Sequence, residues 1–166
     1  MNNSLPNRKR NRYKDFDYTS NGYYFITTCT ENRIDYFGKI HHGKMVLNES
    51  GLIVDKCWND LPNHYNCSLD YYSIMPNHFH GIIIIEKKNI PGKRNYSLSE
   101  IIRGFKTFSS KQINQKRIGI SKFKWQKSFY DRIIRNEKEL FQIRRYIEQN
   151  PIKWEIEKGI PENLDI

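Results

Sequence analysis

The sequence predicts an α+β fold, in which a ferredoxin-like antiparallel sheet of four to five strands carries helices packed on it. Three observations support this prediction. Short runs rich in β-branched and aromatic residues alternate with segments in which apolar residues recur every three or four positions. Two of the runs are separated only by Pro76 and Asn77, which is turn chemistry and indicates adjacent antiparallel strands. With 166 residues, the chain suits one hydrophobic core better than two.

The strands are predicted from their composition. The first is GYYFITTCT at 22–30, and in a short hairpin after it YFGKI and KMVL flank His41, His42 and Gly43. The strands that meet at Pro76 and Asn77 are LDYYSIM and HFHGIIII, and the last strand is WQKSFYDRIIR at 125–135. HFHGIIII ends in four isoleucines and is apolar on both faces, so we expect a central strand that is covered on both sides.

Two helices are predicted in the first two thirds of the chain. The first spans 50–61, where apolar residues recur at i, i+3, i+4 and i+7 until Pro62 stops the pattern. The second begins after Ser97, which can form a capping box with Glu100. Its expected apolar stripe comprises Leu98, Ile101, Ile102, Phe105 and Phe108.

A third helix is predicted after Asn136, with Glu139 three residues further on. It is expected to end near Asn150, because the residue before a proline is pushed away from helical angles and Pro151 follows. Within this arrangement we expect residues 1–20 to be a basic flexible arm, 21–155 a single domain and 156–166 a C-terminal tail. The expected core stripe of the third helix comprises Leu140, Ile143 and Ile147.

The charge of the chain indicates a polyanionic partner. There are 28 Lys and Arg against 18 Asp and Glu, which gives a net charge of +10. The candidates for contacting phosphates are Arg8, Lys9 and Arg10 in the arm and Arg103 and Lys106 on one face of the second helix. A solvated tail and a solvated helix face explain the same residues equally well.

Cysteine usage and hydropathy restrict where the protein works. The three cysteines have no disulfide or metal-ligand spacing, which is typical of buried thiols in a reducing compartment. No stretch of about 18 apolar residues occurs, so we expect no membrane contact and a cytoplasmic location.

The tripeptide HFH contains the strongest chemical signal. Because side chains alternate along a strand, His78 and His80 point to one face and Phe79 to the other. Two neighbouring neutral imidazoles can hold one metal ion. They lie at the mouth of a buried strand beside a turn, and Gly81 leaves room for a close approach of backbone or ligand. Two satisfied or solvent-facing histidines are the alternative interpretation.

The last helix contributes a second pair of polar residues. Tyr146 and Asn150 are four positions apart, so they share a helix face that borders the apolar stripe and can reach the rim of the sheet. Alternatively, Tyr146 is an amphipathic edge residue and Asn150 is an ordinary residue before a proline.

Together, the segments MPNHFHGIIII and YIEQNP resemble the single-tyrosine HUH transposases. This family includes small insertion-sequence transposases and the group associated with repetitive extragenic palindromes (REP). The match comprises histidine, bulky apolar residue and histidine on a strand, and a downstream helix bearing YIxxNP. WQKSFYDRIIR also resembles the strand before the tyrosine helix in the REP-associated group, and the similarity extends from Gly22 to Trp154. The insertion-sequence branch usually has glutamine where Asn150 stands, which favours the REP-associated group.

The resemblance implies the HUH endonuclease fold and a metal-dependent endonuclease and strand transferase, which cleaves hairpin-associated single-stranded DNA through a 5′-phosphotyrosine intermediate. It implies that Tyr146 is the nucleophile and that His78, His80 and Asn150 hold Mg²⁺ or Mn²⁺, although ligand softness alone leaves zinc open. The implied partner is single-stranded DNA with palindromic hairpins, bound by a monomer or a homodimer. Tyr130 is the competing tyrosine, but it lies in a strand pattern with no polar residue at a ligand offset.

Two other functions remain open on the residues alone. A non-catalytic nucleic-acid-binding domain of ferredoxin-like fold would also be basic and aromatic, although the aromatic pattern of RNA-recognition strands is absent. A metal-dependent hydrolase of small molecules could use the two histidines, but the positive charge and the lack of a nearby third histidine or carboxylate count against it.

Overall fold

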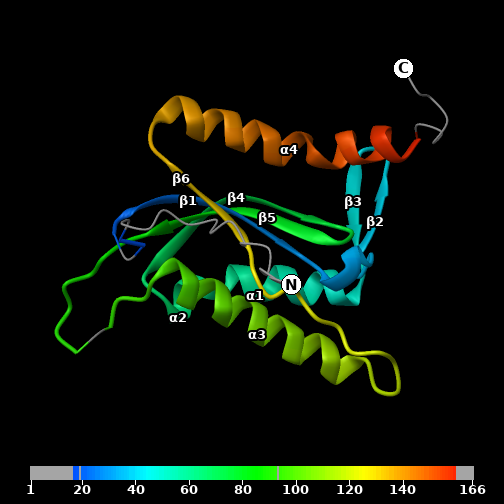
Figure 1. Ribbon diagram of the computed structural model, residues 1–166, viewed down its shortest axis with the longest axis horizontal. Helices are drawn as coiled ribbons and strands as arrows, with labels where there is room; N and C mark the ends of the chain where they lie inside the picture. Colours follow the sequence, from blue (N-terminus) through cyan, green and yellow to red (C-terminus); the bar gives the residue numbers. More distant parts are fainter. Residues whose placement is uncertain (1–16, 19, 93, 160–166) are drawn as a thin grey trace, which may run out of the picture.

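A four-stranded antiparallel sheet with helices on both faces forms the framework of the protein, as Figure 1 shows for the computed structural model. The structure describes residues 17–18, 20–92 and 94–159. Helices α1, α2 and α3 lie on one face of the sheet and α4 lies on the other. In chain order the elements are β1 (Gly22–Cys29), the 3₁₀ turn η1 (Glu31–Arg33), β2 (Gly38–His41), β3 (Lys44–Leu47), α1 (Glu49–Asn59), α2 (Leu61–His64), β4 (Cys67–Met75), β5 (His78–Ile85), α3 (Leu98–Lys116), β6 (Tyr130–Ile134) and α4 (Glu137–Gly159).

The order of the strands confirms the ferredoxin-like prediction. The sheet runs β4-β5-β1-β6, and every pair of neighbours is antiparallel. β5 is a central strand between β4 and β1, as its isoleucine run predicts. β2 and β3 pair only with each other and form a separate two-stranded hairpin.

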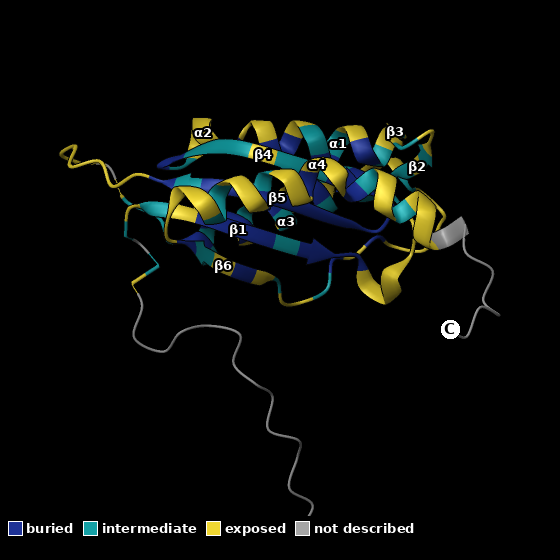
Figure 2. Cartoon of the chain, turned by 90° about the horizontal axis from the view of Figure 1, so that it is seen from above, coloured by how far each residue is buried: buried dark blue, intermediate teal, exposed yellow. Residues whose placement is uncertain are grey.

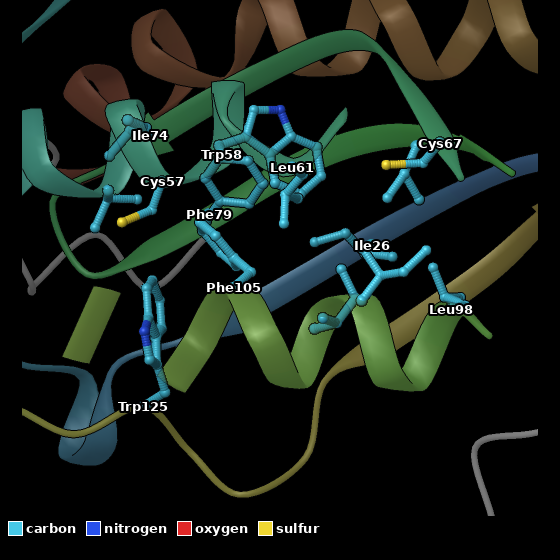
Figure 3. Close-up of a cluster of buried hydrophobic side chains, with 14 of the residues drawn as sticks. Ile26, Cys57, Trp58, Leu61, Cys67, Ile74, Phe79, Leu98, Phe105 and Trp125 are labelled. Carbon is cyan, nitrogen blue, oxygen red and sulfur yellow. The ribbon is translucent and has the colours of Figure 1, made fainter. Parts of the chain in front are cut away.

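The larger hydrophobic core lies between the sheet and helices α1 and α3. In Figure 3, Trp58 of α1, Phe79 of β5 and Phe105 of α3 meet in its centre, and the Trp58 and Phe79 rings are 4.5 Å apart between centroids. Gly81 is needed here, because a Cβ atom on it would lie 2.8 Å from both the Trp58 and the Phe79 ring. The groups that come close to Gly81 are therefore core side chains, Trp58 and Phe79, and not a ligand.

A smaller core holds α4 against the opposite face. Ile143 and Ile147 of α4 pack on Phe25, Ile82 and Ile134 of the sheet, with Leu140 at the margin. Figure 2 looks onto α4 and shows its exposed outer face above strands that are largely buried. The core stripe predicted for the last helix is therefore confirmed.

Two polar contacts fix α4 along the sheet. Arg144 donates from Nε and Nη2 to the two carboxylate oxygens of Asp70, at 3.2 and 2.5 Å. Asp70 lies in an irregularity of the β4–β5 pairing between Leu69 and Tyr72. Such bulges redirect side chains out of the ladder. Near the other end of α4, the backbone N–H of Gly43 donates to Glu155 Oε2 at 2.6 Å.

The predicted end of this helix near Asn150 is wrong, because α4 continues through Pro151 to Gly159. A proline inside a helix removes one hydrogen bond and disfavours the helical turn before it. The residues beyond it are held by tertiary contacts that sequence periodicity does not reveal. Ile152 packs over Gly43 at the tip of the β2–β3 hairpin, Glu155 binds the backbone of the same residue, and Trp154 contacts His78.

Three smaller expectations also need correction. Phe108 is 54% exposed, and the buried stripe of α3 continues through Ser109 and Ile113 instead. The last strand is shorter than 125–135, because only Tyr130–Ile134 forms a strand with β1 and Trp125 makes an isolated bridge. Pro62 does follow the end of α1, but it also stands in the first turn of α2, where a proline is well tolerated.

Substituting Gly43 with alanine should destabilise the protein by about 2–3 kcal/mol. Gly43 has φ +69°, which costs a residue with a side chain about 1–2 kcal/mol, and the new Cβ would lie 2.8 Å from Ile152 Cγ1. Urea unfolding of wild type and variant measures this difference. Gly119→Ala is the matched control, because Gly119 has φ +78° and a Cβ atom added to it would meet nothing within 4 Å. Equal losses in the two variants would show that Ile152 does not press on the hairpin.

Candidate active site

The two histidines of β5 lie side by side under α4, as strand alternation predicts. Their ring centroids are 4.6 Å apart, and the exposed fractions of His78 and His80 are only 8% and 5%. Phe79, between them in sequence, is fully buried in the core on the other face. The pair is therefore covered by α4 and is not a pair of surface histidines.

Hydrogen bonds orient both imidazole rings. Asn77 Nδ2 donates to the carbonyl oxygen of Arg33 at 3.0 Å, which turns Asn77 Oδ1 toward His78 Nδ1 at 2.8 Å. Because an amide oxygen only accepts, the His78 proton lies on Nδ1 and the lone pair on Nε2. Thr27 Oγ1 lies 2.7 Å from His80 Nδ1. The Nε2 atoms of both rings are thus the nitrogens left for a ligand.

Burial keeps both imidazoles neutral. Burial first and the charge of Arg33 second lower the pKa of His78 to about 4, against a weaker opposing effect of Asp35. Burial, followed by the neighbouring His78, lowers the pKa of His80 to about 3. At pH 7 the two rings therefore present lone pairs without first losing a proton, which is the form that binds metal ions.

Tyr146 of α4 lies against one member of this pair, His80. Its ring centroid is 5.3 Å from that of His80, and the ring meets Phe25 edge-on at 6.0 Å. The tyrosine is 42% exposed, so its phenol borders solvent. The competing Tyr130 on β6 contacts Phe25 at 6.4 Å, and among the described residues no ring contact between it and either histidine is found.

Asn150 lies on α4 between two residues that contact the histidines. Tyr146, Asn150 and Trp154 follow one another at intervals of four residues, which places them on one helix face. Tyr146 contacts His80 and Trp154 contacts His78, at 5.5 Å between ring centroids. Asn150 is only 8% exposed. Asn150 therefore lies on the face of α4 that is turned to the sheet.

These residues fit a divalent metal ion by their donor chemistry. Two neutral imidazoles with oriented Nε2 atoms and one buried amide make a nitrogen and oxygen donor set of the kind that holds divalent metal ions. Within the described residues, no group of three or more His, Cys, Asp and Glu side chains is arranged to hold a metal. A third ligand from the described part of the chain would therefore be of another type, such as an amide.

The two basic candidates that the structure describes, Arg103 and Lys106, lie on α3 and not beside this site. Arg103 is exposed on α3, in the layer opposite α4. It lines a groove of about 770 Å³ with Lys122 and Lys127. Lys106 Nζ donates to the carbonyl oxygens of residues 126, 127 and 128, and burial lowers its pKa to about 8. Lys106 thus has a structural role before β6, and Arg8, Lys9 and Arg10 lie outside the described residues.

Several residues of the site were not identified from the sequence. Asn77 had the composition of a turn and Thr27 that of a strand, and only the pairing of β1 with β5 brings Thr27 opposite His80. Trp154 lay beyond the predicted helix end. For Trp154, the sequence contained one signal that it shares a helix face with Asn150, namely its spacing of four residues.

Arg33 has a positive φ of 55° next to Asn32 at 58°, which is a strained backbone conformation. The hydrogen bond that its carbonyl oxygen accepts from Asn77 Nδ2 holds it in place.

Comparison with known proteins identifies the class of protein that this sheet and site define. Residues 18–150 match the family of IS200-like transposases. The chain therefore belongs to that transposase family, and the resemblance seen in its motifs is confirmed. Among the described residues, no helix combines the length and apolarity needed to cross a bilayer.

Two relatives extend this result. An uncharacterised protein of Haemophilus influenzae is 37% identical over 172 residues, which cover 93% of each chain. The structure of a REP-associated tyrosine transposase bound to a REP hairpin is similar with a TM-score of 0.58 and 20% identity, over 80% of this chain and 68% of that one. This similarity confirms the α+β fold with its antiparallel sheet.

Substituting Asn77 with alanine should lower the free energy of unfolding by about 2 kcal/mol. The variant leaves the Arg33 carbonyl and the His78 Nδ1–H without their partner, and unsatisfied buried groups cost about 1–3 kcal/mol. Urea unfolding of metal-free protein provides the measurement. Asn63→Ala is the control, because Asn63 Nδ2 donates to Asp60 Oδ1 on the exposed surface. If both variants lose equally little, Asn77 does not fix the histidine.

Proposed function

We propose that this transposase cleaves single-stranded DNA next to a hairpin and rejoins it through a covalent tyrosine intermediate, in a reaction that requires a divalent metal ion. The observation that carries this proposal is the position of Tyr146, in ring contact with one of two oriented, neutral histidines. Family membership supports the reaction class, and the histidine geometry supports metal assistance.

His78, His80 and Asn150 would hold the metal ion, Mg²⁺ or Mn²⁺. When bound, the ion would neutralise charge on the non-bridging oxygens of the scissile phosphate, which otherwise repels a nucleophile. Asn77 and Thr27 would keep the two Nε2 atoms aimed at the ion. Outer hydrogen bonds of this kind are typically worth about 10–100-fold in metal affinity.

Tyr146 would act as the nucleophile. Its phenolic oxygen would form a bond to phosphorus while the bond from phosphorus to the 3′ oxygen breaks. The electron pair goes to that oxygen, which takes a proton and leaves as a 3′-hydroxyl, and the phenol proton passes to solvent or a base. The 5′-phosphate stays on the protein, so a second 3′-hydroxyl can reverse the step and join strands without ATP.

Two cations near the site would hold the DNA backbone. Lys153 Nζ lies 5.8 Å from the Tyr146 ring centroid, and Arg33 is close enough to lower the pKa of His78. Arg103 and the basic arm with Arg8, Lys9 and Arg10 would contact phosphates farther from the cut, while Lys106 would act through the segment that it anchors. The protein would bind as a monomer or a homodimer.

The hairpin partner is supported by the solved relative, which is described as bound to a REP hairpin. A non-catalytic nucleic-acid-binding domain is the alternative function. It would bind such DNA as well, but it gives no reason for two buried histidines with oriented rings beneath a half-exposed tyrosine. The two functions differ in whether a covalent adduct forms.

Wild-type protein with Mg²⁺ or Mn²⁺ should form a covalent adduct with hairpin-bearing single-stranded DNA, and Tyr146→Phe should abolish it. A 3′ label should remain with the protein on denaturing gels, because the 5′-phosphate of the downstream fragment is held by tyrosine. A hairpin library with randomised single-stranded flanks provides the substrate. Sequencing the captured DNA then gives the position of the cut.

Tyr130→Phe is the matched control, because this second tyrosine lies on the same face of the sheet beside Phe25. It should form the adduct at nearly the wild-type rate. Loss of the adduct in Tyr130→Phe but not in Tyr146→Phe would assign the nucleophile to Tyr130. Cleavage that needs neither tyrosine nor metal would refute the mechanism.

Asn150→Ala should weaken Mn²⁺ binding by about tenfold or more, since even outer-shell partners contribute on that scale. Asn150→Asp should retain binding, because it keeps an oxygen ligand in the same place. Isothermal titration with Mn²⁺ measures both variants. Gln149→Ala is the control, an amide next to Asn150 on the exposed side of α4. Wild-type affinity in Asn150→Ala would remove Asn150 from the ligand set.

A further inference from the structure

A groove of about 400 Å³ opens beside the histidine pair, between α4 and the β2–β3 hairpin. Trp154 and Glu155 of α4 line one side of it, and the other lining residues come from the segment before the hairpin, from β2 and from the turn before β5. They are Asp35, Gly38, Lys39, Ile40 and Pro76. The cleavage mechanism proposed above assigns no role to this groove.

We propose that this groove binds one unpaired nucleobase of the DNA strand, next to the phosphate that is cut, with the Trp154 ring as its stacking surface. This inference rests on the proposed function, since it takes the histidine pair as the place of the scissile phosphate. It adds to that function a recognition site for a single base.

The position of Trp154 links the groove to the reaction. Its ring contacts His78 at 5.5 Å between centroids, so the groove begins within one side chain of the histidine pair. Trp154 also follows Asn150 by one turn on the helix face that carries Tyr146. A strand with its phosphate between Tyr146 and the histidines would therefore pass the indole with an adjacent nucleotide.

The chemistry of the groove favours a base over other groups. Trp154 is only partly buried, whereas Trp58 and Trp125 are buried in the main core. Its neighbours Ile40 and Pro76 are apolar, and Lys39 and Asp35 add a donor and an acceptor at the exposed margin. An aromatic face with a few polar groups around it is the usual platform for an unpaired base.

The size of the groove and the need for a free base face decide which part of the DNA it takes. Its volume lies near the lower end of the range for ligand pockets, about 300–1,000 Å³. The faces of bases within a hairpin stem are already stacked on each other, so only an unpaired base can offer a face to Trp154. The occupant is therefore the single strand that flanks the hairpin.

The test combines variants of Trp154 with abasic DNA. For the sequence that wild type cuts, an abasic residue is placed in turn at each of the positions around the cut. One position next to the cut should lower kcat/KM for adduct formation by about 5- to 100-fold, the usual contribution of stacking on an aromatic ring. Trp154→Leu should lower kcat/KM by a similar factor on intact DNA. On DNA that lacks this base, the variant and the wild type should have the same kcat/KM.

Trp154→Phe separates stacking from packing against His78, because it keeps an aromatic face. It should retain most of the wild-type rate and the sensitivity to the abasic position. Phe141→Leu is the matched control, an aromatic residue on the exposed surface of the same helix, and it should behave as wild type. If Trp154→Leu keeps the wild-type abasic profile, the groove does not read a base.

A binding measurement keeps this inference separate from the cleavage reaction. A short single-stranded oligonucleotide with one 2-aminopurine is titrated with the Tyr146→Phe protein, which cannot form the adduct. Its fluorescence should be quenched on binding, and the additional change Trp154→Leu should remove most of that quenching. Absence of an adduct in wild type would refute the proposed function alone, whereas equal quenching with and without Trp154 would refute the base site.

Discussion

The packing of α4 across the sheet is the contact on which the rest of the site depends. β5 fixes two histidines on a face that has no other helix among the described residues, so the helical side chains that contact them come from α4. The helix is held in its position along the sheet by the Arg144–Asp70 pair and by the contact of Glu155 with the hairpin. One helical turn is about 5.4 Å, so a shift of α4 by a single turn would exchange the residues that face the histidines.

The site also depends on neutral histidines, and the position of the two rings on the sheet keeps them neutral. Removal of water lowers the pKa of both rings, and an Asn and a Thr on neighbouring parts of the chain occupy both Nδ1 atoms. The two effects act together, because burial supplies lone pairs and the hydrogen bonds determine their direction. The strained backbone at Arg33 belongs to the same arrangement, since its carbonyl oxygen holds the Asn77 amide.

The fold was predictable from sequence because its signals are local. Isoleucine runs, the Ser97–Glu100 capping box and the turn at Pro76 each specify their own element, and all of these elements are present. That His78 and His80 share one face of the sheet, opposite to Phe79, followed from strand alternation alone. The features that could not be predicted, such as the end of the last helix, depend on contacts between segments that are far apart in the sequence.

The end of the last helix illustrates that limit. Pro151 is a local signal to stop, and it is overridden by packing on a hairpin more than a hundred residues earlier in the chain. Because the helix was predicted to end near Asn150, Trp154 was not recognised as a residue of the same helix face. The distance of Arg103 and Lys106 from the histidines has a related reason, since periodicity gives the face of α3 but not the layer in which α3 lies.

The division of the site between sheet and helix has a consequence for its assembly. Among the described residues, the apolar cluster that holds α4 has five buried members, whereas the cluster between the sheet and helices α1 and α3 has nineteen. Because apolar burial is the main stabilising contribution, α4 is the layer that separates from the sheet at least cost. Its displacement would carry Tyr146, Asn150 and Trp154 away together and leave both histidines in place. The proposed nucleophile, the proposed amide ligand and the proposed base platform are thus present or absent as one unit.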